Sequence, residues 1–327
     1  MDLIHLLDSA LAAREALFDE KHLGALRLFN GFLEGFPDLS LDLYARSLLI
    51  HNYAAAPQTA PVAEAQAWAL AKLPWLQAVL VKTRQAQTDQ ERRGQLTFGT
   101  TLDRRILENG VWYALDLTMN RDASLYVDTR NLRVWARKNL GGKTLLNTFA
   151  YTGSLGAAAL AGGAARVVQL DRNREFLNLA KTTYTLNGFP IRKSDFLAAD
   201  FFPAVSQLKR AGASFDCVFL DPPFFASTSK GTVDLETGSS QLINKIRPLI
   251  ADGGWLVAIN NALFVSGQDY LASLEALCAD GYLSFEELLP IPADCTGFPQ
   301  TKIGKLPVDP APFNHATKIA LLRVRRK

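Results

Sequence analysis

The chain has 327 residues, of which 48% are hydrophobic and 20% charged, so it can bury one large core or two smaller ones without disulfides or metals. Its formal charge of +3 is too small to establish a nucleic-acid partner by itself. The three cysteines include no C-x-x-C pair, which fits a reduced cytoplasmic protein better than a secreted one. We therefore expect a cytoplasmic protein with two domains.

The N-terminal stretch is predicted to be helical. Residues 2–18, DLIHLLDSALAAREALF, place acids early and interleave apolar with polar residues, unlike the basic start and continuous apolar run of a signal peptide. No stretch of the sequence approaches the roughly 20 apolar residues that span a bilayer. We assign residues 1–24 to an N-terminal helix and expect no membrane partner.

Residues 25–120 predict a small α+β domain, which we interpret as a substrate-recognition domain. Its strand-like stretches are LRLFNGFLEG, LSLDLYARSLLIHNYA, AVLVKTRQ, QLTFGT and VWYALDLT, with one helix at VAEAQAWALAK. The basic stretch at 82–95 and the terminal RVRRK at 323–327 are either phosphate contacts or ordinary solvated segments.

Residues 121–327 predict an α/β domain with a doubly wound, mostly parallel, Rossmann-like sheet. Short apolar strands alternate there with longer helical patterns, as in a parallel sheet covered on both faces. The final two strand-like stretches, YLSFEELLP and HATKIALLRV, permit an antiparallel edge. The other predicted strands are KTLLNTFA, ARVVQLD, FDCVFLD and WLVAINN, and the helices are SLGAAALA, NREFLNLAKTTYTLNG, FPAVSQLKRAG, SSQLINKIRPLI and QDYLASLEALCADG.

The ends of the first three strands of this domain indicate a cofactor site. The loop NTFAYTGSLG at 147–156 carries Tyr151 where the first glycine of a dinucleotide fingerprint belongs. Asp171 ends the second strand, as an acid that binds ribose hydroxyls does, and Asp200 follows the third. This pattern fits S-adenosylmethionine better than NAD. The alternative is a turn glycine at Gly153 and two helix N-caps.

The stretch FDCVFLDPPFF at 215–225 indicates a second binding element. Asp221 follows the fourth strand, and Pro222-Pro223 make a stiff extended corner whose carbonyls are free acceptors. Phe224 or Phe225 adds a flat surface, so the corner can hold a planar base. The alternative is a strand terminator with core phenylalanines. A base held here would face the methyl group of the cofactor.

Several linked motifs resemble the bacterial large-subunit ribosomal RNA methyltransferases, which modify cytosine C5 or guanine N7. They are LYVDTRNLRVWARKN, LLNTFAYTGSLGAAALAGGA, VVQLDRNREFLNLAKTTYTLNG, AADFF and FDCVFLDPPFFASTSK, within about residues 105–265. The resemblance implies a class I methyltransferase fold, S-adenosylmethionine as cofactor and large-subunit ribosomal RNA as partner. It also implies cofactor contacts from Asn147, Phe149, Tyr151, Thr152, Gly153, Asp171, Arg172, Asp200, Phe201, Asp221, Asp128 and Arg130.

The resemblance leaves the remaining roles less defined. A surface ion pair is the alternative for Asp128 and Arg130. Lys230, in the loop after the proline corner, either holds RNA phosphate or is solvated. We predict Asp221, Pro222, Pro223 and Phe224 as catalytic, and Phe225, Lys230, Asn260 and Asn261 as substrate-binding.

The methylated atom is predicted from a position at which this chain differs from the cytosine-C5 members of the family. Cytosine-C5 members carry a cysteine after the fifth strand, because attack at that carbon needs a thiolate, whereas this chain has Asn260 and Asn261. The asparagine pair resembles the guanine-N7 members, so we expect methylation of a guanine nitrogen in large-subunit ribosomal RNA. Cytosine-C5 methylation through Cys295, a catalytically silent RNA-binding protein and an NAD-dependent oxidoreductase are the alternatives. The four histidines show no metal-ligand spacing, so we predict no metal, and either a monomer or a homodimer.

Overall fold

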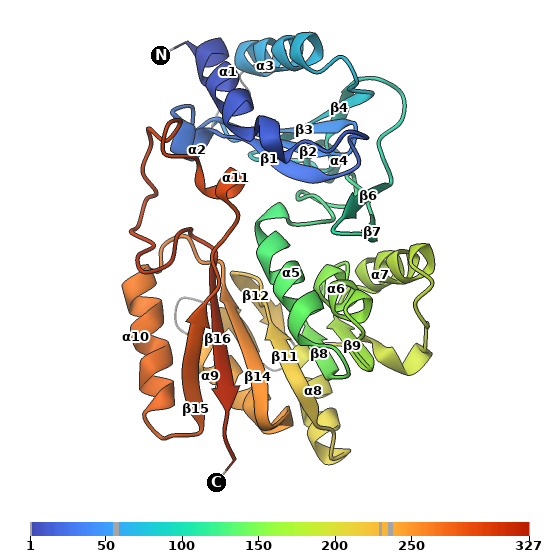
Figure 1. Ribbon diagram of the computed structural model, residues 1–327, viewed down its shortest axis with the longest axis vertical. Helices are drawn as coiled ribbons and strands as arrows, with labels where there is room; N and C mark the ends of the chain where they lie inside the picture. The colour runs from blue at the N-terminus through green and yellow to red at the C-terminus, as the bar shows by residue number, and fades with distance from the viewer. Residues whose placement is uncertain (1, 55–58, 229–230, 235–237, 327) are drawn as a thin grey trace. The chain divides into compact units, whose positions relative to one another are not determined.

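The computed structural model describes residues 2–54, 59–228, 231–234 and 238–326, which form two compact units (Figure 1). Unit 1 comprises Met1–Val127 and Pro292–Leu306, and unit 2 comprises Asp128–Ile291 and Pro307–Lys327. The sequence assigned residues 292–306 to the C-terminal domain. They pack with unit 1 because the buried Arg14 guanidinium donates a hydrogen bond to the carbonyl of Asp294 at 2.8 Å. We call residues 292–306 the strap.

Unit 1 is built on a five-stranded sheet in the order β1-β2-β3-β4-β5. Of its neighbouring strands, β3 and β4 pair in parallel, and the other pairs are antiparallel. Helices α1 and α3 pack on one face of it, where Leu7, Leu28 and Ile50 belong to one core. The elements of unit 1 are α1 (Leu3–Arg14), η1 (Glu15–Leu17), β1 (Ala25–Asn30), α2 (Gly31–Glu34), β2 (Leu39–Tyr44), β3 (Ser47–Asn52), α3 (Thr59–Lys72), β4 (Ala78–Thr83), α4 (Asp89–Arg93), β5 (Gln95–Phe98), β6 (Arg105–Glu108), β7 (Val111–Ala114) and α11 (Ala293–Thr296).

Unit 2 is the predicted doubly wound α/β domain. Its sheet has the order β10-β9-β8-β11-β14-β16-β15, in which the first five strands are parallel. Strand β16 is antiparallel to both of its neighbours, so the predicted antiparallel edge is confirmed. The elements of unit 2 are η2 (Val127–Thr129), α5 (Arg130–Asn139), β8 (Thr144–Thr148), α6 (Ser154–Ala161), β9 (Arg166–Asp171), α7 (Arg174–Leu186), η3 (Lys193–Asp195), β10 (Phe196–Ala198), α8 (Phe201–Arg210), β11 (Phe215–Leu220), β12 (Phe225–Thr228), β13 (Gly231–Asp234), α9 (Ser239–Ile246), η4 (Arg247–Leu249), β14 (Ile250–Asn260), α10 (Gly267–Cys278), β15 (Leu283–Leu288) and β16 (Lys318–Val324).

Both faces of this sheet are covered by helices (Figure 1). Val205 of α8, Ile243 of α9 and Leu274 of α10 share one buried cluster with the strands. On the other face, Trp135 of α5 packs edge-on against Phe219, with ring centroids 6.4 Å apart. A strand segment buried on both faces is apolar, which explains the run CVFL that follows Asp216 in β11.

The strand order fixes where a ligand can bind. From β8 the chain adds β9 and β10 on one side, and then returns to add β11 and β14 on the other. The order therefore reverses between β8 and β11, and the loops after these two strands separate at their carboxyl ends. No helix in the described ranges is long and apolar enough to cross a membrane.

Candidate functional site

The loop after β8 has an unusual backbone. Phe149, Tyr151 and Gly153 all have positive φ angles, of 53°, 51° and 75°. Left-handed backbone is uncommon for phenylalanine and tyrosine, so other contacts must hold the loop in place. Two are hydrogen bonds to β9: the Ala150 N–H donates to the Leu170 carbonyl at 2.9 Å, and the Tyr151 N–H donates to Asp171 Oδ2 at 2.8 Å.

Gly153 is required by both its backbone and its surroundings. An added Cβ would lie 2.7 Å from the Ala180 Cβ and 3.0 Å from Gln169 Nε2. The Gln169 amide donates instead to the Gly153 carbonyl at 3.1 Å, and its oxygen accepts from Asn147 Nδ2 at 2.8 Å. This orients the buried Asn147 amide, whose Oδ1 has no partner among the described residues. Gln169 was not among the predicted site residues, although it is the one polar residue inside the apolar strand VVQLD.

Asp171 connects this loop to the next helix. Its Oδ1 accepts the Asn173 N–H at 2.8 Å, while its Oδ2 holds Tyr151. Burial raises the pKa of this carboxyl, and the backbone donors of Asn173 and Tyr151 act in the opposite direction. Each oxygen has a second lone pair for a further donor. Arg172, the next residue, is exposed.

Aromatic rings line the far side of the same loop. The Phe149 ring stacks on Phe201, with centroids 4.9 Å apart and 21° between the planes. Phe201 is buried as the first residue of α8, so its ring supports Phe149 from the core. Asp200 stands at the N-cap position of α8 without a side-chain capping bond, which does not match the alternative of a helix cap. Thr152 is buried.

Asp221 directly follows β11 at the point where the strand order reverses. Burial, and secondarily the charge of Asp128, raises the pKa of the half-buried Asp221 carboxyl to about 7. Phe224 is 41% exposed, so it is not a core residue. The predicted rim of free carbonyls is partly wrong, because the Pro222 carbonyl accepts Asn261 Nδ2 at 3.4 Å, while Pro223 is exposed.

Asp128 is held by the last strand region. Its Oδ2 accepts the Thr317 hydroxyl at 2.9 Å, and the Thr317 N–H donates to His315 Nδ1 at 3.0 Å. Its Oδ1 is buried and has no hydrogen-bond partner among the residues described. Arg130 is the first residue of α5. Thr317 and His315 were not among the predicted site residues, since nothing in the stretch FNHATK shows that it returns to Asp128.

The two asparagines at the end of β14, Asn260 as its last residue and Asn261 directly after it, have different surroundings. Asn260 Oδ1 accepts the Ala262 N–H at 2.9 Å, so this side chain shapes the turn. Lys318 supports the same turn by donating to the Ala262 carbonyl at 2.9 Å, although burial lowers the pKa of this lysine to about 8. Asn261 faces Pro222, and its Oδ1 has no partner within the described residues.

The unpartnered atoms of unit 2 share one chemistry. In its described part, the buried side-chain atoms without a hydrogen bond are all acceptor oxygens, on Asp128, Asn147 and Asn261. Asn147 lies one residue before the end of β8, Asn261 follows β14, and Asp128 acts electrostatically on Asp221. Buried acceptors normally have donors, so this edge of the sheet suits a ligand that supplies N–H or O–H groups.

The remaining predicted residues are Lys230, Phe225 and the cysteines. Lys230 lies outside the described residues, as does the side chain of Phe225, whose backbone opens β12. Cys217 is fully buried and burial raises the pKa of its thiol, as it also does for Cys278. Cys295, the predicted alternative nucleophile, is fully buried in α11 of unit 1. No group of three metal-ligating side chains occurs in the part of the chain that the structure describes.

Residues 60–302 match the family described as S-adenosylmethionine-dependent methyltransferase. YwbD of Bacillus subtilis is 32% identical over 269 residues, and the match covers 78% of this chain and 65% of YwbD. Ribosomal RNA large subunit methyltransferase I of Photobacterium profundum is 29% identical, over 79% of this chain and 67% of that protein. The chain thus spans about two thirds of the length of these relatives. The crystal structure of SMU.776 complexed with SAH has the same fold, with a TM-score of 0.85, 21% identity, and coverage of 98% of this chain and 81% of that chain.

Proposed function

The chain belongs to the family of S-adenosylmethionine-dependent methyltransferases, and from this premise we propose that it methylates a guanine nitrogen in large-subunit ribosomal RNA. The observation that carries the proposal is the set of buried acceptor oxygens on Asp128, Asn147 and Asn261, which lack donors among the described residues, at the edge where the strand order reverses. The substrate class comes from relatives that are named as large-subunit ribosomal RNA methyltransferases.

The residues at this edge fit the cofactor. S-adenosylmethionine has donor groups in its ammonium and its ribose hydroxyls, and when bound it supplies an electrophilic methyl group. In our proposal Asp171 accepts the ribose hydroxyls through its remaining lone pairs, while the strained loop 149–153 shapes the pocket wall. Asp200 would accept from adenine. Asn147 and Phe201 act indirectly, since Asn147 bonds Gln169 and Phe201 supports the Phe149 ring.

Asp221 would bind the target base. The rigid Pro222-Pro223 segment fixes the direction of its carboxylate, and the exposed Phe224 ring offers a face for stacking. A carboxyl with a pKa of about 7 can accept a hydrogen bond from an N–H of guanine, and can take up a proton when an exocyclic amine is methylated. Asn261 ties the proline corner to the end of β14.

The burial of the cysteine thiols favours a guanine nitrogen over cytosine C5 as the methylated atom. Attack at C5 requires a thiolate next to the base. Cys217 is buried within β11, where burial raises the pKa of its thiol well above the ordinary value. Cys295 is fully buried in unit 1. A ring nitrogen of guanine already has a lone pair, so alignment with the methyl group is the main requirement.

The proposal is tested by mapping the product. Large-subunit RNA from a strain lacking the gene would be incubated with the protein and methyl-labelled cofactor, digested, and analysed by mass spectrometry. We expect label in a methylguanosine that the untreated RNA lacks. Label in 5-methylcytidine, or no label in RNA, would contradict it.

The cytosine alternative has its own test. Replacing Cys295→Ser should leave methyl transfer within about threefold, because no thiolate takes part in the proposed transfer to a guanine nitrogen. The thermal midpoint, measured alongside, reports whether the substitution at this buried position perturbs the fold. Loss of at least 100-fold in kcat at an unchanged midpoint would instead favour a thiolate mechanism.

A further inference from the structure

Three strands of the unit 1 sheet end at a common edge. Strand β2 is antiparallel to both β1 and β3, and β4 is parallel to β3, so β1, β3 and β4 point the same way. The residues that follow them are Phe32 in α2, Tyr53 and Arg84. Strand β5 is antiparallel to β4, so its last residue, Phe98, lies at the opposite edge.

The first three side chains contact one another. The Phe32 ring meets Tyr53 edge-on, with centroids 4.8 Å apart at 75°, and the Arg84 guanidinium lies 5.5 Å from the centre of the Tyr53 ring. Phe32 remains 40% exposed. The edge therefore presents aromatic surface together with a cation.

The Arg84 side chain is held in place by hydrogen bonds to residues 121 and 122. Both of its side-chain hydrogen bonds to described residues use Nη1, which donates to Asp122 Oδ1 at 2.7 Å and to the Arg121 carbonyl at 2.8 Å. The fully buried Lys82 donates to the carbonyls of Asn120 and Asp122 at 2.6 and 2.8 Å. These bonds anchor the loop at residues 120–122, and the exposed Arg121 is held next to Arg84.

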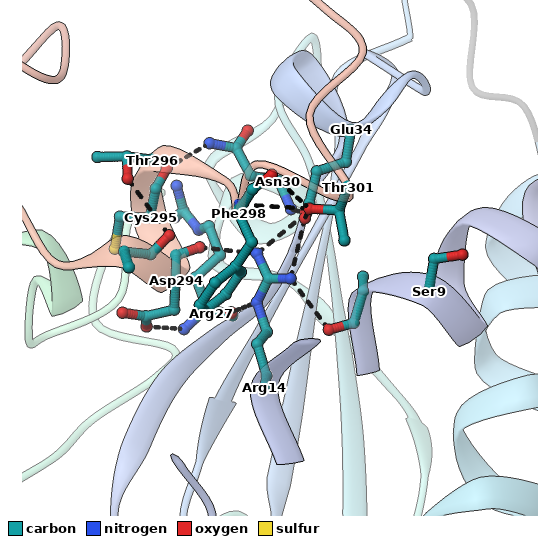
Figure 2. Close-up of polar contacts among 12 residues, drawn as sticks. Ser9, Arg14, Arg27, Asn30, Glu34, Asp294, Cys295, Thr296, Phe298 and Thr301 are labelled. Atoms are coloured by element: carbon teal, nitrogen blue, oxygen red, sulfur yellow. Dashed lines mark hydrogen bonds and ion pairs between the residues drawn. The ribbon is translucent and has the colours of Figure 1, made fainter. Parts of the chain in front are cut away.

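The Phe32 side is fixed by the strap. Glu34, in the same short helix as Phe32, forms two hydrogen bonds with the buried Arg14 at 2.9 and 3.0 Å and accepts the Thr301 hydroxyl (Figure 2). The Ile303 N–H also donates to the Leu33 carbonyl at 2.7 Å.

The part of the strap that contacts α2 also carries two lysines. Gly304 lies so close to α2 that an added Cβ would be 2.2 Å from the Phe32 carbonyl oxygen. Lys302 and Lys305 flank this glycine and are exposed. Arg84 and the neighbouring Arg121 therefore lie on the Tyr53 side of the edge, and the two lysines belong to the segment that packs on the backbone of Phe32.

We propose that this aromatic edge, defined as Phe32, Tyr53, Arg84, Lys302 and Lys305, binds a single-stranded segment of the RNA substrate outside the target nucleotide. Aromatic rings stack on any base, and interleaved cations neutralise the neighbouring phosphates. Bases in a duplex have no free faces, so the segment is unpaired. This inference rests on the proposed function, because it concerns the same RNA.

The binding test uses the full chain and a labelled 20-nucleotide single-stranded RNA in fluorescence anisotropy. Phe32→Ala should weaken binding about tenfold, as expected for one lost base stack. Phe98→Ala is the matched control, since Phe98 is also 40% exposed but lies at the opposite edge, and it should bind like the unmodified protein.

A second variant does not depend on the aromatic packing. The double change Lys302→Gln and Lys305→Gln removes two exposed charges and should lower the slope of log affinity against log salt by roughly 1 to 2. A slope equal to that of the unmodified protein would mean that these lysines do not reach phosphate, which would overturn their part of the edge.

Kinetics separate this proposal from the proposed function. With RNA as substrate, Phe32→Ala should raise KM about tenfold and leave kcat and cofactor affinity unchanged. If Phe32→Ala and Phe98→Ala have equal KM values while methyl transfer proceeds, the aromatic edge is wrong and the proposed function stands. If no RNA is methylated but RNA binding still requires Phe32, the proposed function fails and the edge stands. A Phe32-dependent dimer in sedimentation, without RNA binding, would overturn the edge in favour of a second copy.

Discussion

The buried Arg14 of unit 1 and the buried residues around Asp221 in unit 2 differ in how completely they are hydrogen-bonded. In unit 1 all five N–H groups of Arg14 have acceptors, on Ala10, Arg27, Glu34 and Asp294 (Figure 2). In unit 2 Asp128 and Asn261 each keep a buried oxygen without a donor in the described structure, beside a carboxyl whose pKa is raised. A buried guanidinium with all of its hydrogen bonds made stabilises the fold, whereas buried acceptor oxygens that lack donors at the carboxyl edge of the sheet are available to a ligand.

The largest effect is expected at the buried Arg14. Arg14→Met should lower the free energy of unfolding of the chain by about 3 to 5 kcal/mol, because the Glu34 carboxylate would stay buried without its partner. Urea denaturation measures this. Lys72→Met is the control, since its ion pair with Asp8 is exposed and should contribute at most about 1 kcal/mol. Similar losses in the two variants would contradict the structural role of Arg14.

The next effect concerns the residues around Asp221. Asp221→Asn should lower kcat at least about 100-fold without lowering stability, because the acceptor for the base is weakened. Asp216→Asn on the same strand is the control. Its carboxylate bonds Thr144 at the other end of β11, at 2.7 and 2.9 Å, so stability should fall and kcat should not. Equal kcat losses would argue against a special role for Asp221.

A comparison of alanine substitutions at Gly153 and Gly163 distinguishes backbone strain from steric conflict. Gly153→Ala should cost about 2 to 3 kcal/mol of stability and weaken cofactor binding, because the new methyl group meets Ala180 and Gln169. Gly163→Ala shares the positive φ, of 86°, but has open space around its Cβ, so it should cost about 1 kcal/mol. Thermal unfolding measures the stability of the two variants, and calorimetric titration measures their affinity for the cofactor. Indistinguishable variants would show that the loop tolerates the methyl group.

The pH dependence of stability tests the raised pKa of Asp221. The pKa of Asp221 is about 7 in the folded chain and 3.8 ordinarily, so the folded state keeps a proton that the unfolded state releases. This contribution is complete below pH 4 and is lost as pH rises to 7. The free energy of unfolding should therefore fall more steeply between these values in the unmodified protein than in Asp221→Asn. Parallel curves would exclude the raised pKa.

Methyl transfer should show the opposite trend with pH. If the carboxylate is the form that binds the base, kcat/KM rises as pH passes through 7. Asp128→Asn removes the second cause of the shift, so the midpoint of this rise should move to lower pH. An unmoved midpoint would mean that burial alone sets the pKa.

The sheet of unit 2 could be predicted because its strands are buried on both faces. Apolar runs such as CVFL, separated by helical periods, leave few other arrangements, and the acids at their ends follow the sheet topology. Asp171 and Asp221 were identifiable for this reason, since each ends a strand that the sequence already indicates.

Other site residues could not be predicted because they depend on contacts between distant segments. Thr317 reaches Asp128 across 189 positions, and the strap reaches Arg14 across 280. Local patterns do not encode such pairs. Phe201 was predicted at the cofactor but is buried behind Phe149, which the sequence AADFF cannot distinguish from a ring that faces the ligand.

A crystal structure of the chain grown with S-adenosylhomocysteine tests the central claim most directly. We predict that the ligand lies at the carboxyl ends of β8, β9 and β11, with its ribose hydroxyls bonded to Asp171 and its ammonium bonded to at least one of the unpartnered oxygens of Asp128 and Asn261. A ligand bound elsewhere, with these oxygens still lacking donors, would contradict the account.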